Sequence, residues 1–155
     1  MKYKLLAVIL LISSLMLTGC ASGPTYQDYA ASIPPVPEDS GRFYIYRVGA
    51  FAGAIQPSLK VNNEIVGKAV PQGFFFIDRP AGNYVFSAST EVERSLSLTL
   101  QKNQERYIKL EPKMGLFVGH IKPVLVDNSV GKVEIVKTKY TGDLSEDFVK
   151  SSPKE

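Results

Sequence analysis

The chain has 155 residues, of which 45% are hydrophobic and 21% are charged, so it fits one globular domain of ordinary size and is neither disordered nor collagen-like in composition. Its single cysteine excludes an intrachain disulfide framework and a multi-cysteine zinc site. The formal net charge of +3 includes two lysines within the first 19 residues, and without them the charge is +1, which gives no electrostatic reason to expect a nucleic-acid partner.

The first 20 residues have the zones of an export signal. Lys2 and Lys4 form a positive start, residues 5–17 form an apolar run, and small residues lead to Cys20. The apolar run is too short to span a hydrocarbon core of about 30 Å, which needs about 20 residues. We therefore predict a signal peptide over residues 1–19 that is cleaved between Gly19 and Cys20.

The sequence Leu17-Thr18-Gly19-Cys20 resembles the lipobox of bacterial lipoproteins, in which an aliphatic residue and two small residues precede an obligatory cysteine. The resemblance implies that the Cys20 sulfur, a good nucleophile as the thiolate, receives a diacylglyceryl group as a thioether. Cleavage then frees the Cys20 amine for a further acyl chain such as palmitate. Because Ala21 and not Asp follows the cysteine, the resemblance favours the outer membrane, on its periplasmic face. An ordinary secretory leader with an unmodified cysteine is the alternative.

Residues 20–40 form a proline-rich segment that we predict to be a lipidated tether. Pro24 and the run Ile33-Pro34-Pro35-Val36-Pro37 favour an extended polyproline II path. Twenty residues reach at most about 66–72 Å, which is enough to hold a domain away from a bilayer. Tyr26 and Tyr29 would either dock this segment on the domain or lie at the lipid interface.

From residue 41 to residue 140 the apolar residues follow a period of two, which predicts short strands separated by turns. Asn62-Asn63, Pro80-Ala81-Gly82 and Lys102-Asn103 have the residue types of tight turns. Pro123 cannot donate a ladder hydrogen bond, so its strand is expected at a sheet edge or a bend. The predicted strands cover residues 42–47, 58–61, 64–70, 73–78, 83–89, 95–100, 106–111, 115–126 and 132–136.

This pattern predicts an all-β domain over residues 41–140, built as a small antiparallel β-sandwich, with a small barrel as the alternative. The tail over residues 141–155 is predicted to hold a short C-terminal helix, because Asp143 and Glu146 have the spacing of a capping box. The predicted core residues are Phe43, Ile45, Val61, Phe74, Phe76, Val85, Leu96, Leu98, Leu100, Ile108, Leu110, Val133 and Ile135.

Several of these segments occur in an order that resembles a known family. They are Arg42-Phe43-Tyr44-Ile45-Tyr46-Arg47, the hairpin over residues 61–67, Gly73-Phe74-Phe75-Phe76, Pro80-Ala81-Gly82-Asn83-Tyr84 and Arg106-Tyr107-Ile108-Lys109. The order is similar to the domain of unknown function 2846 family (DUF2846), found in bacterial lipoproteins. The hairpin and the proline turn are also similar to surface-layer PEGA modules, which are small β-sandwiches. The resemblance covers residues 41–136 and implies a β-sandwich in the cell envelope. It gives no catalytic residues to transfer to this chain, since the family has no assigned activity.

The chain offers few residues for catalysis. His120 is its only histidine, and it shares strand parity with Lys122, which predicts an edge or solvent-facing side chain. Glu91 and Glu93 are predicted to lie in a solvated loop, although a carboxylate pair can serve a cell-wall hydrolase or bind Ca²⁺. The sequence has neither a nucleophile elbow nor a phosphate-binding glycine loop. We therefore predict a protein that is not an enzyme and that has no cofactor and no metal site.

The predicted binding surface is aromatic. Tyr44, Tyr46, Phe75 and Tyr84 would form one amphipathic face, unless both faces of their sheet are buried in a sandwich. Together with the lipobox, this face predicts a lipid-anchored envelope protein whose non-catalytic β-sandwich binds a protein or glycan partner. The alternative is a carrier that holds a small apolar ligand or lipid in a β-barrel cavity. Membrane attachment is expected through the covalent lipid on Cys20 alone.

Overall fold

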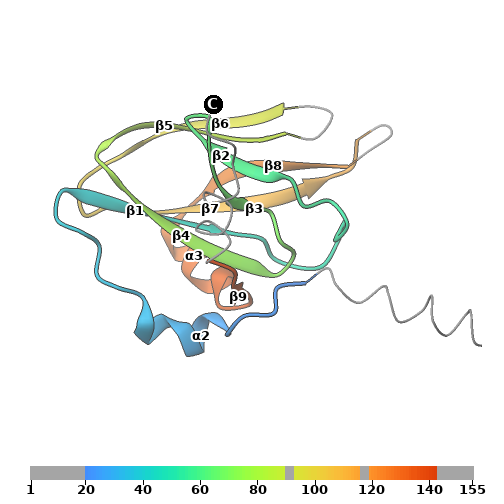
Figure 1. Ribbon diagram of the computed structural model, residues 1–155, viewed down its shortest axis with the longest axis horizontal. Coiled ribbons are helices and arrows are strands. Elements are labelled where there is room, and N and C mark those ends of the chain that lie inside the picture. Colours follow the sequence, from blue (N-terminus) through green and yellow to red (C-terminus); the bar gives the residue numbers. More distant parts are fainter. Residues whose placement is uncertain (1–19, 90–92, 116–118, 143–155) are drawn as a thin grey trace, which may run out of the picture.

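The computed structural model describes residues 20–89, 93–115 and 119–142, and it shows two β-sheets with helices along one side (Figure 1). The five-stranded sheet has the order β8-β7-β1-β4-β9, and the four-stranded sheet has the order β3-β2-β5-β6. The strands are β1 (Ser40–Tyr46), β2 (Ser58–Val61), β3 (Glu64–Lys68), β4 (Gly73–Pro80), β5 (Gly82–Ser89), β6 (Glu93–Leu100), β7 (Glu105–Lys113), β8 (His120–Val126) and β9 (Lys139–Tyr140). The helices are α2 (Tyr26–Tyr29), the 3₁₀ turn η1 (Ala30–Ser32) and α3 (Asn128–Ile135).

Most neighbouring strands are antiparallel, but the five-stranded sheet contains two parallel pairs, β1 with β7 and β4 with β9. Two parallel strands need a long connection between them. The connection between β1 and β7 contains all four strands of the second sheet. The predicted β-sandwich is confirmed. The barrel alternative is wrong, because the strands form two separate sheets.

Strand β1 lies in the middle of the five-stranded sheet, and every residue from Gly41 to Tyr46 is buried. Phe43 and Ile45 face the four-stranded sheet, whereas Tyr44 and Tyr46 face the helices. Aromatic and β-branched residues on both sides of one strand are the pattern of a strand covered on both faces.

Asparagine residues make the predicted turns. Asn62 and Asn63 have φ angles of 48° and 69°, as the tight hairpin between β2 and β3 requires. Asn62 also accepts a hydrogen bond from the Val85 amide through its Oδ1 at 2.9 Å, which ties the turn to β5. Asn103 has a φ of 57° in the turn between β6 and β7. These turn predictions are confirmed.

Side chains from both sheets fill the space between them. The rings of Phe43 and Phe86 meet edge to face, with centroids 4.8 Å apart. Two predicted core residues are wrong: Val85 is 43% exposed on the outer face of the four-stranded sheet, and Val133 is 65% exposed on α3. The predicted residues confirmed in this first core are Phe43, Ile45, Val61, Leu100, Ile108 and Leu110, with Leu96 and Leu98 partly buried.

A second core lies between the five-stranded sheet and the helices. Tyr44 stacks on Tyr107 with centroids 5.0 Å apart. The Tyr46 hydroxyl donates to Glu134 Oε2 at 2.8 Å, and Lys109 Nζ donates to Glu134 Oε1 at 2.7 Å. Burial opposes ionisation of Glu134, but these two hydrogen bonds outweigh it and hold the pKa of Glu134 below its usual value. The predicted core residues Phe74, Phe76 and Ile135 belong to this second core.

Helix α3 occupies the place of the strand predicted over residues 132–136, and that prediction is wrong. The preceding Asp127 caps the helix, because its Oδ1 accepts a hydrogen bond from the Ser129 amide at 2.8 Å. Gly131 and Ile135 lie four residues apart, share one side of the helix and are buried. Burial of that side against the sheet decides the structure over the β propensity of the valines and isoleucine.

Two predictions concern the C-terminal third of the chain. Strand β8 is an edge strand of the five-stranded sheet and contains Pro123, as predicted. The helix predicted from Asp143 lies outside the described residues.

The proline-rich segment packs on the domain through two of its tyrosines. Tyr26 meets the ring of Phe74 edge to face at 5.2 Å between centroids, and Tyr29 stacks on Tyr140 at 3.8 Å. Thr25 pairs with Lys139 as an isolated bridge. Of the two sequence-based options for the tyrosines, docking on the domain is the one observed.

Arg42 holds the same segment from inside the sheet. Its Nε and Nη2 each donate to one oxygen of Asp78 at 2.7 Å, and its Nη1 donates to the Pro34 carbonyl at 2.8 Å. Its guanidinium also lies over the Phe76 ring, 4.4 Å from the centroid. Burial alone would lower the pKa of Arg42, but its hydrogen bonds to Asp78 raise it above the usual value. The segment is therefore fixed by ring packing and by the hydrogen bond from Arg42 to Pro34, while the bidentate ion pair with Asp78 orients Arg42.

We predict that Gly131→Ala lowers the free energy of unfolding by about 1–3 kcal/mol, because the new Cβ would collide with the Tyr107 ring and push α3 off β7. Urea unfolding followed by circular dichroism measures this loss. The control is Val133→Ala on the open side of the same helix, with an expected change below about 0.5 kcal/mol. Equal losses in the two variants would contradict close packing of α3 at Gly131.

Candidate functional site

The start of the described chain presents the predicted lipidation residue. Cys20 is exposed, and its sulfur forms no disulfide. The next residue, Ala21, is 6% exposed and donates its amide hydrogen to the Pro71 carbonyl at 3.0 Å. The fold therefore begins one residue after the predicted acceptor sulfur. The other predicted lipobox residues, Leu17, Thr18 and Gly19, lie outside the described residues.

A buried arginine organises the loops beside Cys20. Arg47 is fully buried and donates to four backbone carbonyls at 2.6–2.9 Å: those of Phe51, Ala52, Ile55 and Ala69. Burial lowers the pKa of its guanidinium, and the nearby Cys20 sulfur acts in the opposite direction. In the described part of the chain Arg47 has no carboxylate partner and its Nε has no hydrogen-bond partner, so the four backbone carbonyls are the groups that bind its guanidinium.

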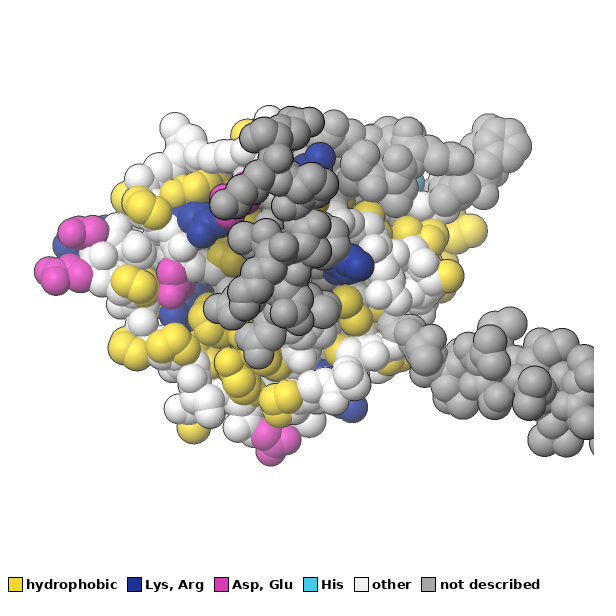
Figure 2. Space-filling model, in the orientation of Figure 1, with side chains coloured by type: hydrophobic (Ala, Val, Ile, Leu, Met, Phe, Trp, Pro, Cys, Tyr) yellow, Lys and Arg dark blue, Asp and Glu magenta, His cyan; other side chains and the backbone are white. Residues whose placement is uncertain are grey.

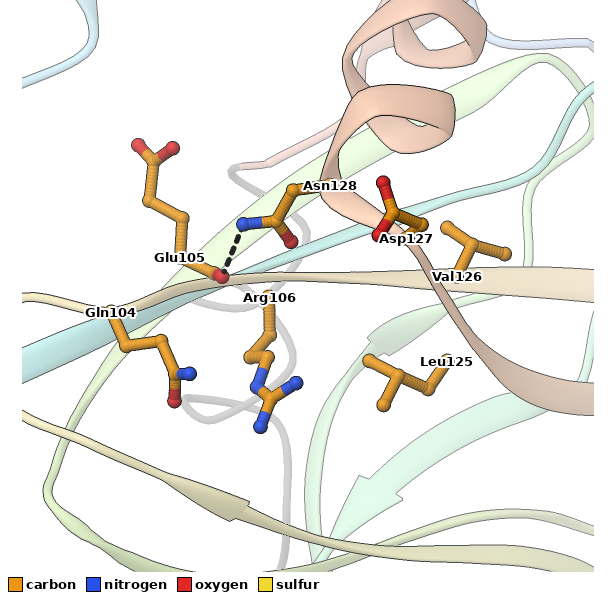
Figure 3. A pocket seen from close by; sticks show the side chains of 7 residues that line it. All are labelled: Gln104, Glu105, Arg106, Leu125, Val126, Asp127 and Asn128. Atoms are coloured by element: carbon orange, nitrogen blue, oxygen red, sulfur yellow. Dashed lines mark hydrogen bonds between the residues drawn. The ribbon is translucent and has the colours of Figure 1, made fainter.

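A surface pocket of about 480 Å³ lies where β7 begins, β8 ends and α3 starts (Figure 3). Asn128 donates from Nδ2 to the Glu105 carbonyl at 3.1 Å, which ties α3 to β7. Figure 3 shows the Glu105 and Asp127 side chains on the helix side of β7, and those of Gln104 and Arg106 on the opposite side. These groups do not converge on one point, so they do not form an acid–base pair.

Arg106 has unused hydrogen-bonding capacity at this pocket. Its Nη2 donates weakly to the Thr99 carbonyl at 3.4 Å, and within the described residues its buried Nε has no partner. Because this Nε is buried, a ligand in the surface pocket cannot reach it in the observed structure.

The outer side of α3 beside the pocket is apolar. Val130, Val133 and Val136 are 46%, 65% and 37% exposed, and Leu125 at the pocket rim is 36% exposed. Their spacing of three residues places the valines on one side of the helix, opposite Gly131 and Ile135. These three valines are called the α3 face below, whereas Leu125 pairs with Ile108 and points to the other side of the five-stranded sheet.

The four aromatic residues predicted as a binding surface do not form one. Tyr44 and Tyr46 point into the second core, whereas Phe75 lies in the first core and Tyr84 packs against it. Tyr44, Tyr46 and Phe75 are at most 5% exposed, and the Tyr84 hydroxyl donates to the Pro80 carbonyl at 2.7 Å. Both faces of the five-stranded sheet are covered, so alternate residues of β1 and β4 enter two different cores.

The structure describes the strands of two of the residues considered for catalysis. His120 begins the edge strand β8 and is partly exposed. Glu93 begins β6, and Glu91 lies outside the described residues. Across the described ranges, no group of three histidine, cysteine, aspartate or glutamate side chains is placed to hold a metal ion. None of the helices in the described part of the chain is long and apolar enough to cross a membrane.

Comparison with known proteins places the chain in a family. The family model described as "Protein of unknown function (DUF2846)" matches residues 37–121, more than half of the chain. The chain belongs to this family, as its β-strand order and hairpins led us to expect. It is also similar to a Haemophilus influenzae protein named "Uncharacterized protein", with 27% identity over 129 residues that cover 80% of this chain and 77% of the relative. No solved structure matches the chain.

Sequence reasoning missed Arg47 and the α3 face, although both leave a signal. Arg47 shares strand parity with Phe43 and Ile45, so a charged residue continues an inward-facing row. The valines at 130, 133 and 136 have a helical spacing of three, which the period-two interpretation of residues 132–136 hid.

We predict that Arg47→Lys lowers the free energy of unfolding by about 1–3 kcal/mol, because a lysine cannot reach all four carbonyls and leaves buried acceptors without donors. Thermal or urea unfolding measures this. Arg79→Lys is the control, since Arg79 pairs with the exposed Glu64. The free energy of unfolding of this variant should fall by less than about 1 kcal/mol. A variant Arg47→Lys as stable as the native protein would mean that the four carbonyls do not depend on the guanidinium for their hydrogen bonds.

Proposed function

We propose that the protein is a lipid-anchored protein of the bacterial cell envelope, and that its β-sandwich binds a protein partner without catalysing a reaction. The observation that carries the anchor is the apolar run of residues 5–17 followed by Leu17-Thr18-Gly19-Cys20, with the only cysteine of the chain in the acceptor position. The exposed sulfur of Cys20, one residue before the fold begins, supports the same proposal.

The attached lipid is a diacylglyceryl thioether on Cys20, with a further acyl chain on its amine. Each buried methylene contributes about 0.8 kcal/mol, so two or three chains give stable attachment where one would be marginal. The neutral Ala21 after the cysteine supports the outer membrane, on its periplasmic face, as the location.

The α3 face is the surface we propose for the partner. It is apolar at its centre, and the exposed Lys132 lies beside the valines on α3. Apolar centres with a polar rim are typical of protein interfaces. The surface therefore fits a protein whose own apolar patch is bordered by acidic groups. Aliphatic side chains lack the flat aromatic surface on which sugars stack, so a glycan fits this face less well.

Neither alternative gains support from the geometry. A carrier would need an apolar cavity, but large side chains such as Phe43, Phe75 and Phe86 fill the space between the two sheets. A cell-wall hydrolase would need converging acid and base groups, and the pocket residues lie on opposite sides of β7.

We predict that Cys20→Ser abolishes acylation and leaves the signal peptide uncleaved, because an alcohol does not replace the thiolate in the thioether-forming step. Mass spectrometry of the N-terminal peptide, with fractionation of the membranes, measures both effects. Ser22→Ala, a change at an exposed position two residues away, is the control and should mature normally. An unmodified N-terminal peptide from the native protein would refute lipid anchoring.

We predict that Val133→Asp removes most of the partner captured by crosslinking in cells, because a carboxylate placed in the α3 face repels an acidic-rimmed partner and disrupts the apolar centre. Val85→Asp, on the outer face of the other sheet, is the matched control and should leave capture unchanged. Crosslinking followed by mass spectrometry compares the two variants. Equal capture by both would remove the α3 face as the binding surface.

A further inference from the structure

The docked proline-rich segment determines how far the domain lies from its anchor. Twenty extended residues reach about 66–72 Å, but the segment from Ala21 to Tyr29 is folded against β4 and β9 instead. Pro24 accepts the Tyr140 amide hydrogen at 2.8 Å, and Tyr26 donates its own to the Thr138 carbonyl at 3.0 Å. An acyl group on Cys20 is therefore separated from the folded domain by a single peptide unit.

One end of the sandwich surrounds this attachment point. Ala21 is bonded to Pro71, and a Cβ placed on Gly53 would lie 3.7 Å from the Pro71 ring. Gly119, at the start of the neighbouring β8, approaches Ile55 so closely that a Cβ there would lie 2.5 Å from its Cδ1. The loop between β1 and β2 and the described ends of the β7–β8 connection, at Lys113 and Gly119, thus lie together near Cys20. Figure 1 shows the loop between β1 and β2 at the right-hand end of the fold, close to the start of the described chain.

This end exposes two large apolar side chains. Phe51 is 59% exposed in the β1–β2 loop, and Met114 is 73% exposed just after β7. Figure 2 shows hydrophobic side chains gathered along the same edge of the molecule. A single exposed apolar residue is ordinary, but here two of the most exposed ones share the end from which the anchor leaves.

The backbone that presents Phe51 is held rigidly. Arg47 Nη2 donates to the Phe51 carbonyl at 2.6 Å and to the Ala52 carbonyl at 2.9 Å. Ala52 has a φ of 54°, a left-handed conformation that a residue with a Cβ rarely adopts. A buried charge and a strained residue thus keep this loop in a shape that leaves the Phe51 ring in solvent.

We propose that this end of the sandwich rests on the bilayer surface, with Phe51 and Met114 in the lipid headgroup region. The proposal rests on lipid anchoring at Cys20, because the anchor brings this end, and no other, to the membrane. Aromatic and apolar side chains at the headgroup level gain burial without a transmembrane segment. The α3 face consists of aliphatic side chains of a different part of the surface, so it stays available to a partner.

Tryptophan fluorescence tests this orientation, because the chain has no tryptophan of its own. Phe51→Trp is produced as the full, acylated protein, purified from membranes and reconstituted in phosphatidylcholine vesicles with brominated acyl chains. The tryptophan emission is expected to shift to the blue and to be quenched by the bromine atoms. Val133→Trp on α3 is the matched control, a similarly exposed position that should emit as in water and remain unquenched.

The outcomes separate the two proposals. An acylated Cys20, with quenched emission in the Phe51→Trp variant and unquenched emission in the Val133→Trp variant, supports the orientation. Acylated protein in which the Phe51→Trp variant emits as in water, or in which both variants are quenched equally, overturns the orientation and leaves lipid anchoring intact. An unacylated Cys20 in the mass spectrum of the native protein overturns both. Circular dichroism of each variant confirms that the compared proteins are folded.

Discussion

Burial of β1 on both faces is the constraint on which the rest of the structure depends. Phe43 and Ile45 need the four-stranded sheet to cover them, and Tyr44 and Tyr46 need a third layer. The third layer consists of α3 and the docked proline-rich segment, neither of which has a core of its own. Removing α3 would expose tyrosine rings and leave Tyr46 and Lys109 without Glu134. Removing the segment would leave Arg42 without the Pro34 carbonyl.

The sequence predicts the β-sandwich well because its information is local there. Alternation in β6 and the asparagine turns determine strands and hairpins without reference to distant residues. It fails at residues 132–136, where β-branched residues form a helix. That outcome depends on Gly131 meeting Tyr107, a contact between segments more than twenty residues apart that no local pattern contains.

The site was harder to predict than the fold for a related reason. Aromatic residues in β1 and β4 suggested an exposed platform, but whether a strand face is open depends on what covers it, and here α2, η1 and α3 do. The residues left open instead are valines, on the side of α3 that turns away from the sheet. Residue type alone favours aromatic side chains as binding residues. Which side of α3 is exposed, in contrast, is determined only when the layers pack together.

The packing of Tyr26 and Tyr29 has a practical consequence for anyone working with the isolated domain. The family match begins at residue 37, and the first strand begins at Ser40, so a shortened chain starting near Gly41 looks like a natural boundary. Such a truncation would strip the rings that cover Phe74 and Tyr140 and leave Arg42 without the Pro34 carbonyl. Fragments of the domain should therefore begin at Ala21. Fragments that begin later would expose a hydrophobic, tyrosine-rich patch and aggregate.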